Sequence, residues 1–203
     1  MKFRLISNPH VRITGLFAMI ACLIACGGSS VYVPVDTVTQ FDDRFSDTDL
    51  RNMAEKMTRS LVSSREIANA SGMNNIALLS IKNSTTEFIN TNSILDKMLV
   101  ALLRTGIFSI VDRNAIDKIS GEMNLSQSGF ISPESALKMG RGLAAKYVVY
   151  GELDSIRKES RNESLSYYKL TLKCLNCETT GLIWADEYEL KKQSKKSMLR
   201  WKP

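Results

Sequence analysis

Histidine is almost absent from this chain, because His10 is the only one among its 203 residues. It lies within the first 25 residues, which we expect to be removed. A mature chain without histidine cannot build a Ser-His-Asp or Cys-His catalytic site, nor offer an imidazole to a metal. Catalysis by paired carboxylates would need only acids, but these are scattered over expected helix caps, turns and strand surfaces. The sequence therefore predicts no enzymatic activity, no cofactor and no metal site.

Long apolar runs are also missing, except for one near the start. Lys2, Arg4 and Arg12 precede an apolar run over residues 13–25. This run has about 13 residues, whereas a helix needs about 20 to cross the hydrocarbon of a membrane, so a permanent span is the weaker interpretation. A basic start followed by a short apolar run is typical of a signal peptide, which we predict over residues 1–25.

The end of this run contains a candidate lipid-attachment site. Leu23-Ile24-Ala25-Cys26 resembles the lipobox of bacterial lipoproteins, in which the cysteine thiol accepts the diacylglyceryl group. Cys22 is a poorer candidate because cleavage before it would shorten the apolar run further. We therefore predict lipidation at Cys26. In an enterobacterial-type sorting system, Gly27 rather than aspartate after this cysteine implies anchoring at the outer membrane with the domain facing the periplasm.

The two ends of the mature chain differ in composition from its middle. Residues 26–45 contain Gly, Ser and Pro without a helical period, which predicts a lipidated tether that reaches at most ~65 Å when extended. Removal of the signal lowers the formal net charge from +6 to +3. Much of the remaining positive charge lies beyond residue 190, and residues 193–203 form a predicted basic tail. That tail either contacts anionic lipid, cell-wall polymer or an acidic protein, or is a solvated terminus.

The middle of the chain, residues 46–192, has the composition of one globular domain, since the chain as a whole is 44% hydrophobic and 24% charged. Ser46 and two following aspartates predict a helix start, and Leu50, Met53, Met57 and Leu61 recur at helical spacing. Helices alternate with strands before three strands close the chain. We therefore predict an α/β fold in which helices cover a mixed sheet with a C-terminal antiparallel meander. The expected helices cover 46–64, 92–105, a short piece from 113, and 133–142; the expected strands cover 74–82, 107–111, 147–156, 165–177 and 182–190.

Two motifs have the spacing of functional sites in an unsuitable context. Gly140-Arg141-Gly142 matches part of a dinucleotide fingerprint, but here it ends a helix and precedes a strand, which predicts a helix stop. Cys174-Leu175-Asn176-Cys177 has redox spacing at the end of a strand, where the two side chains face opposite sides. Buried thiols are favoured there over a local disulfide. Nucleic acid is not an expected partner, because the aromatic residues are spread among core-like positions and the chain is exported.

Several segments, taken in order, resemble the LpoB family of outer-membrane lipoproteins, which activate bifunctional class A penicillin-binding proteins in peptidoglycan synthesis. The resemblance spans residues 46–192. It depends on the order of the segments, because each segment alone is a common helix, strand or turn sequence. They are Asp49-Leu50, Met53 to Met57, Asn83-Ser84-Thr85, Thr91 with Ile94, Leu102 to Gly106, Gly140 to Gly151, Tyr167 to Leu172, and Thr180 to Glu187.

The resemblance implies a TolB-N-terminal-like α/β fold and a protein partner, namely a class A penicillin-binding protein, rather than a substrate. The chain departs from the family in its tether, because the familiar members have a long, proline-rich one and this chain has about 19 residues there. The same fold occurs in curli-secretion and flagellar accessory lipoproteins. A structural subunit of such an envelope assembly is therefore the alternative function.

The loop over residues 83–90 is the candidate partner-binding surface. It follows a buried strand at an edge where ligands gather in α/β sheets. We expect Asn83, Thr85 and Glu87 to form a polar rim around an apolar anchor of Phe88 and Ile89. In the alternative, Phe88 folds back into the core. The lysines and arginine from 191 to 202 are the next candidate surface.

Overall fold

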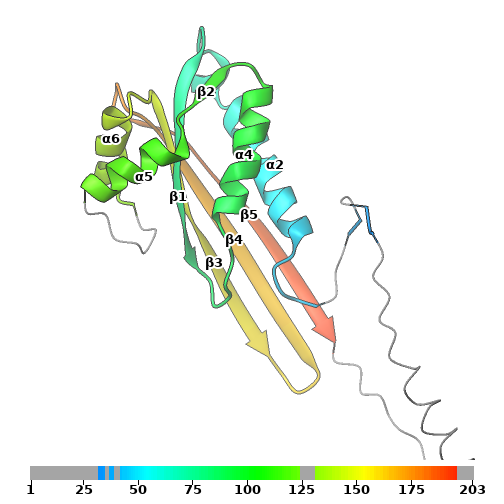
Figure 1. Ribbon diagram of the computed structural model, residues 1–203. Helices are drawn as coiled ribbons and strands as arrows, with labels where there is room; N and C mark the ends of the chain where they lie inside the picture. Colours follow the sequence, from blue (N-terminus) through cyan, green and yellow to red (C-terminus); the bar gives the residue numbers. More distant parts are fainter. Residues whose placement is uncertain (1–31, 35–36, 39–41, 124–130, 196–203) are drawn as a thin grey trace, which may run out of the picture. The chain divides into compact units, whose positions relative to one another are not determined.

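The computed structural model describes residues 32–34, 37–38, 42–123 and 131–195 (Figure 1). Contacts divide the chain into two units, Met1–Thr37 and Val38–Pro203, and every described helix and strand belongs to the second. The predicted signal peptide, Cys22, Cys26 and residues 196–203 lie outside the described residues. Within the described ranges, no helix has the length and apolar character needed to cross a membrane.

The second unit is a five-stranded mixed sheet with helices on both faces, as the sequence predicts. The strand order is β2-β1-β3-β4-β5; β1 runs parallel to β2 and β3, and the pairs β3-β4 and β4-β5 are antiparallel (Figure 1). The elements are α2 (Asp47–Ser63), α3 (Arg65–Ala68), β1 (Asn74–Ser84), α4 (Asn92–Arg104), β2 (Phe108–Ile110), α5 (Arg113–Glu122), α6 (Pro133–Gly142), β3 (Tyr147–Glu159), β4 (Glu163–Asn176) and β5 (Leu182–Lys195).

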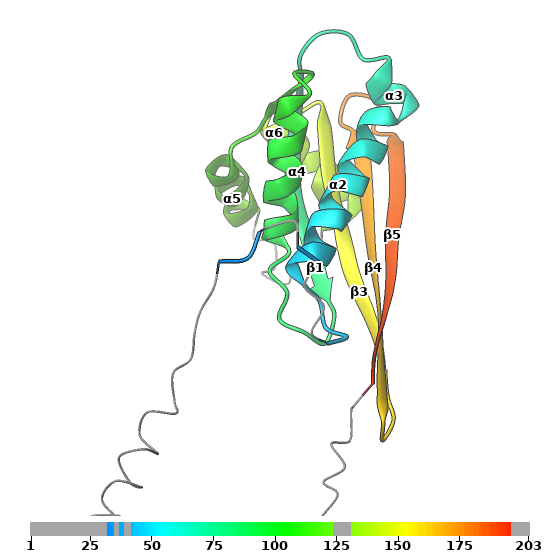
Figure 2. The ribbon, with the colours of Figure 1, turned by 90° about the vertical axis from the view of Figure 1, so that its right-hand side faces the viewer.

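The nearly continuous apolar run of β1 is explained by a core on each face of the sheet. Ile76 and Leu78 face the larger core, beneath α2 and α4, whereas Ala77 and Leu79 face a smaller one beneath α5 and α6 (Figure 2). Successive side chains of a strand point to opposite faces, so a strand covered on both sides is apolar at every position. The Met stripe of α2 packs into the larger core, as the sequence predicts.

The predicted helix ends are confirmed in part. Ser46 and Asp49 form a reciprocal capping box at the start of α2, Ser132 caps α6, and Gly106 adopts the left-handed conformation after α4 with φ 74°. Thr91 precedes α4 as expected but does not cap it with its side chain. Instead, its hydroxyl donates to the Ile81 carbonyl at 2.7 Å, which joins the helix start to β1.

The two motifs with functional spacing lie in packed, structural positions of the fold. Cys174 and Cys177 are free, buried thiols that belong to the cores on opposite faces of the sheet. Burial raises the pKa of both, which disfavours a reactive thiolate. Gly140 lies within α6, and a Cβ there would meet the Cys177 Sγ at 2.4 Å. Close packing therefore explains this glycine without a nucleotide.

The largest difference from the sequence analysis concerns the last strands. β3, β4 and β5 are all longer than predicted, and β5 extends through Lys195. Residues 193–195 of the predicted basic tail therefore belong to β5, and Lys192 is buried rather than solvated. The strands are longer because their far ends pack against the segment that precedes α2, a contact between distant parts of the chain.

Candidate partner-binding site

The predicted loop begins within β1, and a side-chain amide holds its shape. The Asn83 Oδ1 accepts hydrogen bonds from the Thr85 N–H at 3.0 Å and from the Thr85 hydroxyl at 2.7 Å. Its Nδ2 donates to the carbonyls of Glu87 at 2.9 Å and Ile89 at 3.3 Å. The Thr85 Oγ1 also accepts the Glu87 N–H at 3.1 Å. Asn83 and Thr85 are therefore used inside the loop, where they fix its backbone.

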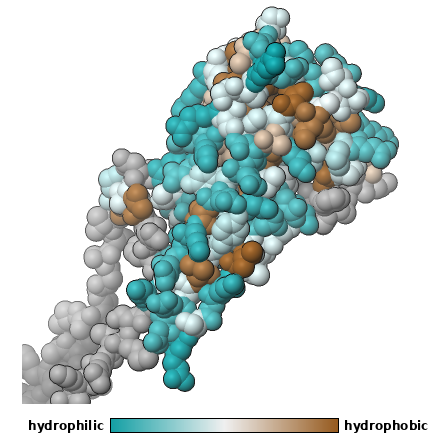
Figure 3. All heavy atoms as spheres, turned by 180° about the vertical axis from the view of Figure 1, so that it is seen from behind, coloured by the Kyte–Doolittle hydropathy of each residue, from teal (hydrophilic) through white to brown (hydrophobic). Residues whose placement is uncertain are grey.

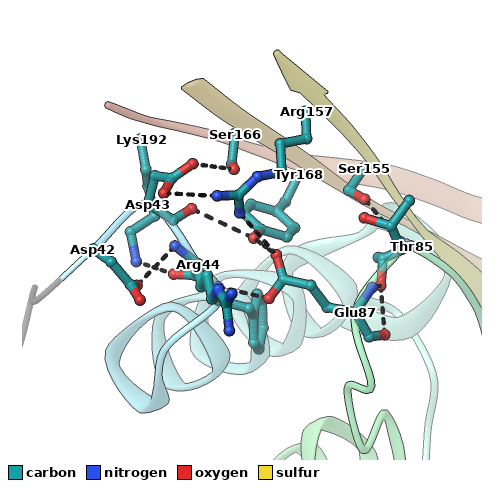
Figure 4. Close-up of polar contacts among 12 residues, drawn as sticks. Asp42, Asp43, Arg44, Thr85, Glu87, Ser155, Arg157, Ser166, Tyr168 and Lys192 are labelled. Carbon is teal, nitrogen blue, oxygen red and sulfur yellow. Dashed lines mark hydrogen bonds and ion pairs between the residues drawn. The ribbon is translucent and has the colours of Figure 1, made fainter. Parts of the chain in front are cut away.

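Glu87 connects this loop to the rest of the domain. Its carboxylate accepts hydrogen bonds from the Tyr168 hydroxyl and from the Phe45 N–H, the latter at 3.3 Å, and lies 4.0 Å from the Arg157 guanidinium (Figure 4). Only 22% of its side chain is exposed. The expectation of a freely exposed rim charge at Glu87 is therefore wrong, because its partners come from β3, β4 and the segment before α2.

The two apolar residues of the loop have different surroundings. Ile89 is partly buried and packs against the larger core, whereas Phe88 is fully exposed, with a relative accessibility of 101%. The alternative in which Phe88 folds back into the core is excluded by this placement. A large exposed aromatic on a braced backbone can enter a partner's pocket with little loss of backbone freedom.

The segment before α2, residues 42–46, packs against the same end of the sheet. Asp43 is 2% exposed; it accepts the Ser166 hydroxyl at 2.7 Å and lies 3.3 Å from Arg157. Burial alone would raise its pKa, but hydrogen bonds from Ser166 and Ser164 and the charge of Arg157 outweigh this and lower the pKa. The residues just before the expected domain start are therefore part of its packing.

Lys192 secures this segment from β5. Its Nζ donates to the Arg44 carbonyl at 2.5 Å and to Asp49 Oδ2 at 2.8 Å, and the side chain is 6% exposed. A buried lysine requires such partners, because an unpaired charge inside a protein is costly. No local sequence pattern indicates this contact, since the partners are 143 and 148 positions apart.

Beside Phe88 the surface is hollowed and lined by both charge signs. Arg157 lies on its floor, with a guanidinium that donates to Glu159 at 2.8 Å and also contacts Asp43 and Glu87. The hydrogen bond that Arg157 donates to Glu159 is the largest cause of the raised pKa of Arg157. Arg44 is exposed at the rim. The hollow is lined by Arg44, Thr86, Glu87, Phe88, Arg157 and Glu159.

This arrangement is suited to binding rather than to a reaction. The side chains around Phe88 include neither a nucleophile beside a base nor an imidazole. Across the ranges that the structure describes, no group of three or more His, Cys, Asp or Glu side chains could hold a metal ion. An exposed aromatic surrounded by polar groups is the usual composition of a protein-binding hot spot.

Comparison with family models shows one family, and solved structures share its fold. A family model described as peptidoglycan-synthase activator LpoB matches residues 49–190. The LpoB C-terminal domains from Salmonella enterica and Escherichia coli superpose with TM-scores of 0.54 and 0.53; each is 17% identical and covers 70% of this chain and 98% of its own. The NMR structure of E. coli LpoB gives a TM-score of 0.54 at 16% identity, with 85% of each chain covered. A search of curated proteins found no match.

Proposed function

This chain belongs to the LpoB family of peptidoglycan-synthase activators, and we propose that it binds and activates a bifunctional class A penicillin-binding protein. The family match over residues 49–190 is the observation that carries the proposal. An activator of this kind has no chemistry of its own. It binds the active conformation of the synthase more tightly than the inactive one, and the activation cannot exceed that difference in affinity.

The exposed Phe88 is the proposed anchor of the contact with the synthase. It lies beside the hollow that contains Arg157, with Arg44 at the rim. Asn83 and Thr85 hold the loop from within, and Glu87 attaches it to the sheet. Because the loop is already ordered by these bonds, binding does not have to order it, which favours affinity. Ile89, the next residue, packs against the larger core and so holds the backbone beside Phe88 in place.

The proposed location follows from the start of the chain. Residues 1–25 direct export, Cys26 carries the lipid at the outer membrane, and the domain faces the periplasm. Asp43 is the first described residue that bonds to the sheet, and the roughly 16 residues from 27 to 42 would span roughly 55 Å when extended and roughly 22 Å as a flexible coil. The synthase must therefore extend a docking domain towards the anchored end of this protein.

A capture experiment followed by an activity assay tests the function. The mature chain, tagged at its C-terminus, is incubated with detergent-solubilised envelope, and the bound proteins are identified by mass spectrometry. We expect a class A penicillin-binding protein whose glycan polymerisation rises when the chain is added back. The Phe88→Ala chain is the matched control and should recover much less of it.

The alternative function has a distinct outcome in the same experiment. Recovery of secretion-pore or flagellar components in place of a synthase would support a structural subunit of an envelope assembly. Capture of the synthase without any change in its polymerisation rate would contradict activation while leaving binding in place.

A further inference from the structure

The outer strand β5 has a free edge along a length unusual for an edge strand. It has 14 residues and, among the strands that the structure describes, pairs with β4 alone, since it is the last strand in the sheet order. Figure 2 shows β5 at the right-hand side of the sheet, with no described strand beyond it. Its pairing with β4 is regular from Trp184 to Lys195. A straight edge of this kind presents unpaired backbone N–H and C=O groups to another strand.

One face of β5 is already occupied within the domain. Trp184 and Asp186 bond to Ser60 of α2, and Tyr188 lies below Lys56, whose Nζ is 5.0 Å from the ring centroid. The opposite face is exposed at every second residue from Ala185 to Lys195. Only this exposed face and the edge itself remain open to a partner.

Charges alternate across the exposed face of the strands and reach the edge. Asp154 of β3 lies opposite Lys169 of β4, which lies opposite Glu189 of β5. This row therefore ends on a negative group at the free edge. In the next row Lys191 is the edge residue, opposite Tyr167. The Lys191 side chain is exposed. Figure 3 views the molecule from behind, where hydrophilic side chains surround scattered apolar ones.

The order of charges along β5 is complementary to itself in the antiparallel direction. Its first half carries Asp186, Glu187 and Glu189, and its second half carries lysines. If two copies pair about Leu190, Glu189 of each faces Lys191 of the other, and the alternating row continues. If the centre of the pairing were Glu189 or Lys191, the two copies of that charged residue would lie opposite each other, which is destabilising. A register shift by one residue would place odd-numbered positions of one copy opposite even-numbered positions of the other. The exposed face of one strand would then lie beside the face that packs against α2 in the other.

We propose that β5 pairs antiparallel with β5 of a second copy of this chain, centred on Leu190, so that the two sheets form one continuous sheet. The paired segment is Ala185 to Lys195 in each copy. The Phe88 loop is attached through β3, β4 and the segment before α2, so the edge of β5 is separate from the proposed synthase site. The dimer would present two synthase sites on one assembly.

Cysteine pairs introduced at exposed positions test this pairing and its register in the full, membrane-bound chain. Under the proposed register Glu187 faces Gln193 of the other copy, whereas two copies of Glu187 are about 20 Å apart. We expect the Glu187→Cys, Gln193→Cys double variant to form a disulfide-linked dimer under mild oxidation, and each single variant to stay largely monomeric. Equal cross-linking by the single variants would indicate random collision and overturn the proposal. Absence of cross-linking in the double variant, or cross-linking to another protein, would overturn it too.

Charge reversal in the double-cysteine background tests the complementarity itself. Glu189→Lys or Lys191→Glu alone should lower the cross-linked fraction at least threefold, because each places like charges opposite. The chain carrying both reversals should recover the original fraction, as should co-expression of the two single-reversal chains. If a single reversal leaves the fraction unchanged, the proposed register is wrong.

Discussion

The Tyr168 hydroxyl donates a hydrogen bond to the Glu87 carboxylate, 81 positions earlier in the chain. Tyr168 is fully buried in β4 and packs edge-on against Phe45, with ring centroids 5.5 Å apart. Burial, and then the bond to Glu87, raise the pKa of Tyr168, so it stays a donor at every physiological pH. Through this contact the loop that carries Phe88 is held by the core of the sheet.

Tyr168→Phe should lower the free energy of unfolding by about 2 kcal/mol, because it leaves a partly buried carboxylate without one donor. Urea denaturation followed by circular dichroism measures the change. Tyr167→Phe is the matched control: its hydroxyl also donates to a carboxylate, that of Glu189, but at an exposed position. It should leave stability nearly unchanged, because solvent screens an exposed contact of this kind. Equal effects of the two variants would contradict a special role for the Tyr168 contact.

Glu87→Lys should destabilise the domain by about 2 kcal/mol or more, because a cation would replace the acceptor of two hydrogen bonds and lie beside Arg157. Glu87→Gln should cost less, since an amide oxygen can still accept. Thermal melting of the three chains gives the order. If Glu87→Lys melts like the unchanged chain, Glu87 is a free rim charge after all.

Phe88→Ala should weaken binding of the recovered synthase at least tenfold, since a fully exposed aromatic anchor is lost. Its stability should stay within about 0.5 kcal/mol of the unchanged chain. Met73→Ala provides the control, because Met73 is also exposed, at 71%, but lies outside this loop. Isothermal titration calorimetry compares the affinities. Similar affinities for all three chains would remove Phe88 from the interface.

The contribution of Asp43 to stability should disappear in acid. Its pKa is lower in the folded chain than its ordinary value of 3.8, so the unfolded chain takes up the proton first as pH falls. The contribution is therefore complete above about pH 5 and declines below pH 4. Melting temperatures of the Asp43→Asn chain and the unchanged chain should differ most at pH 6 and converge towards pH 3. Asp47→Asn, at an exposed helix start, should show a much smaller difference at pH 6.

Cys26→Ala should leave an unprocessed precursor without lipid, because the thiol that accepts the lipid is gone. Mass spectrometry of the membrane fraction distinguishes the precursor from the processed form. Cys22→Ala is the control and should be processed normally. A lipid-modified N-terminus on the Cys26→Ala chain would rule out this residue as the attachment site.

Local pattern was sufficient for most elements of the fold. Capping residues, helical spacing and period-two strands act between neighbours in the sequence, so the starts of α2 and α6, the stop at Gly106 and the final meander could be read from the residues. The exposed position of Phe88 could not be derived in this way. An apolar residue in a loop is compatible with either the core or the surface until its neighbours are placed.

The sequence by itself determined the α/β class and the starts of α2 and α6, because each depends on residue type and short spacing. The export signal stays a prediction. Only the tertiary structure decided that Asp43 and Lys192 are buried and that Glu87 is engaged. Their partners are 42 to 148 positions away. A charged residue at the surface and one paired in the interior have the same local sequence pattern. Burial of a charge depends on the partner that compensates it, and the fold alone brings that partner close.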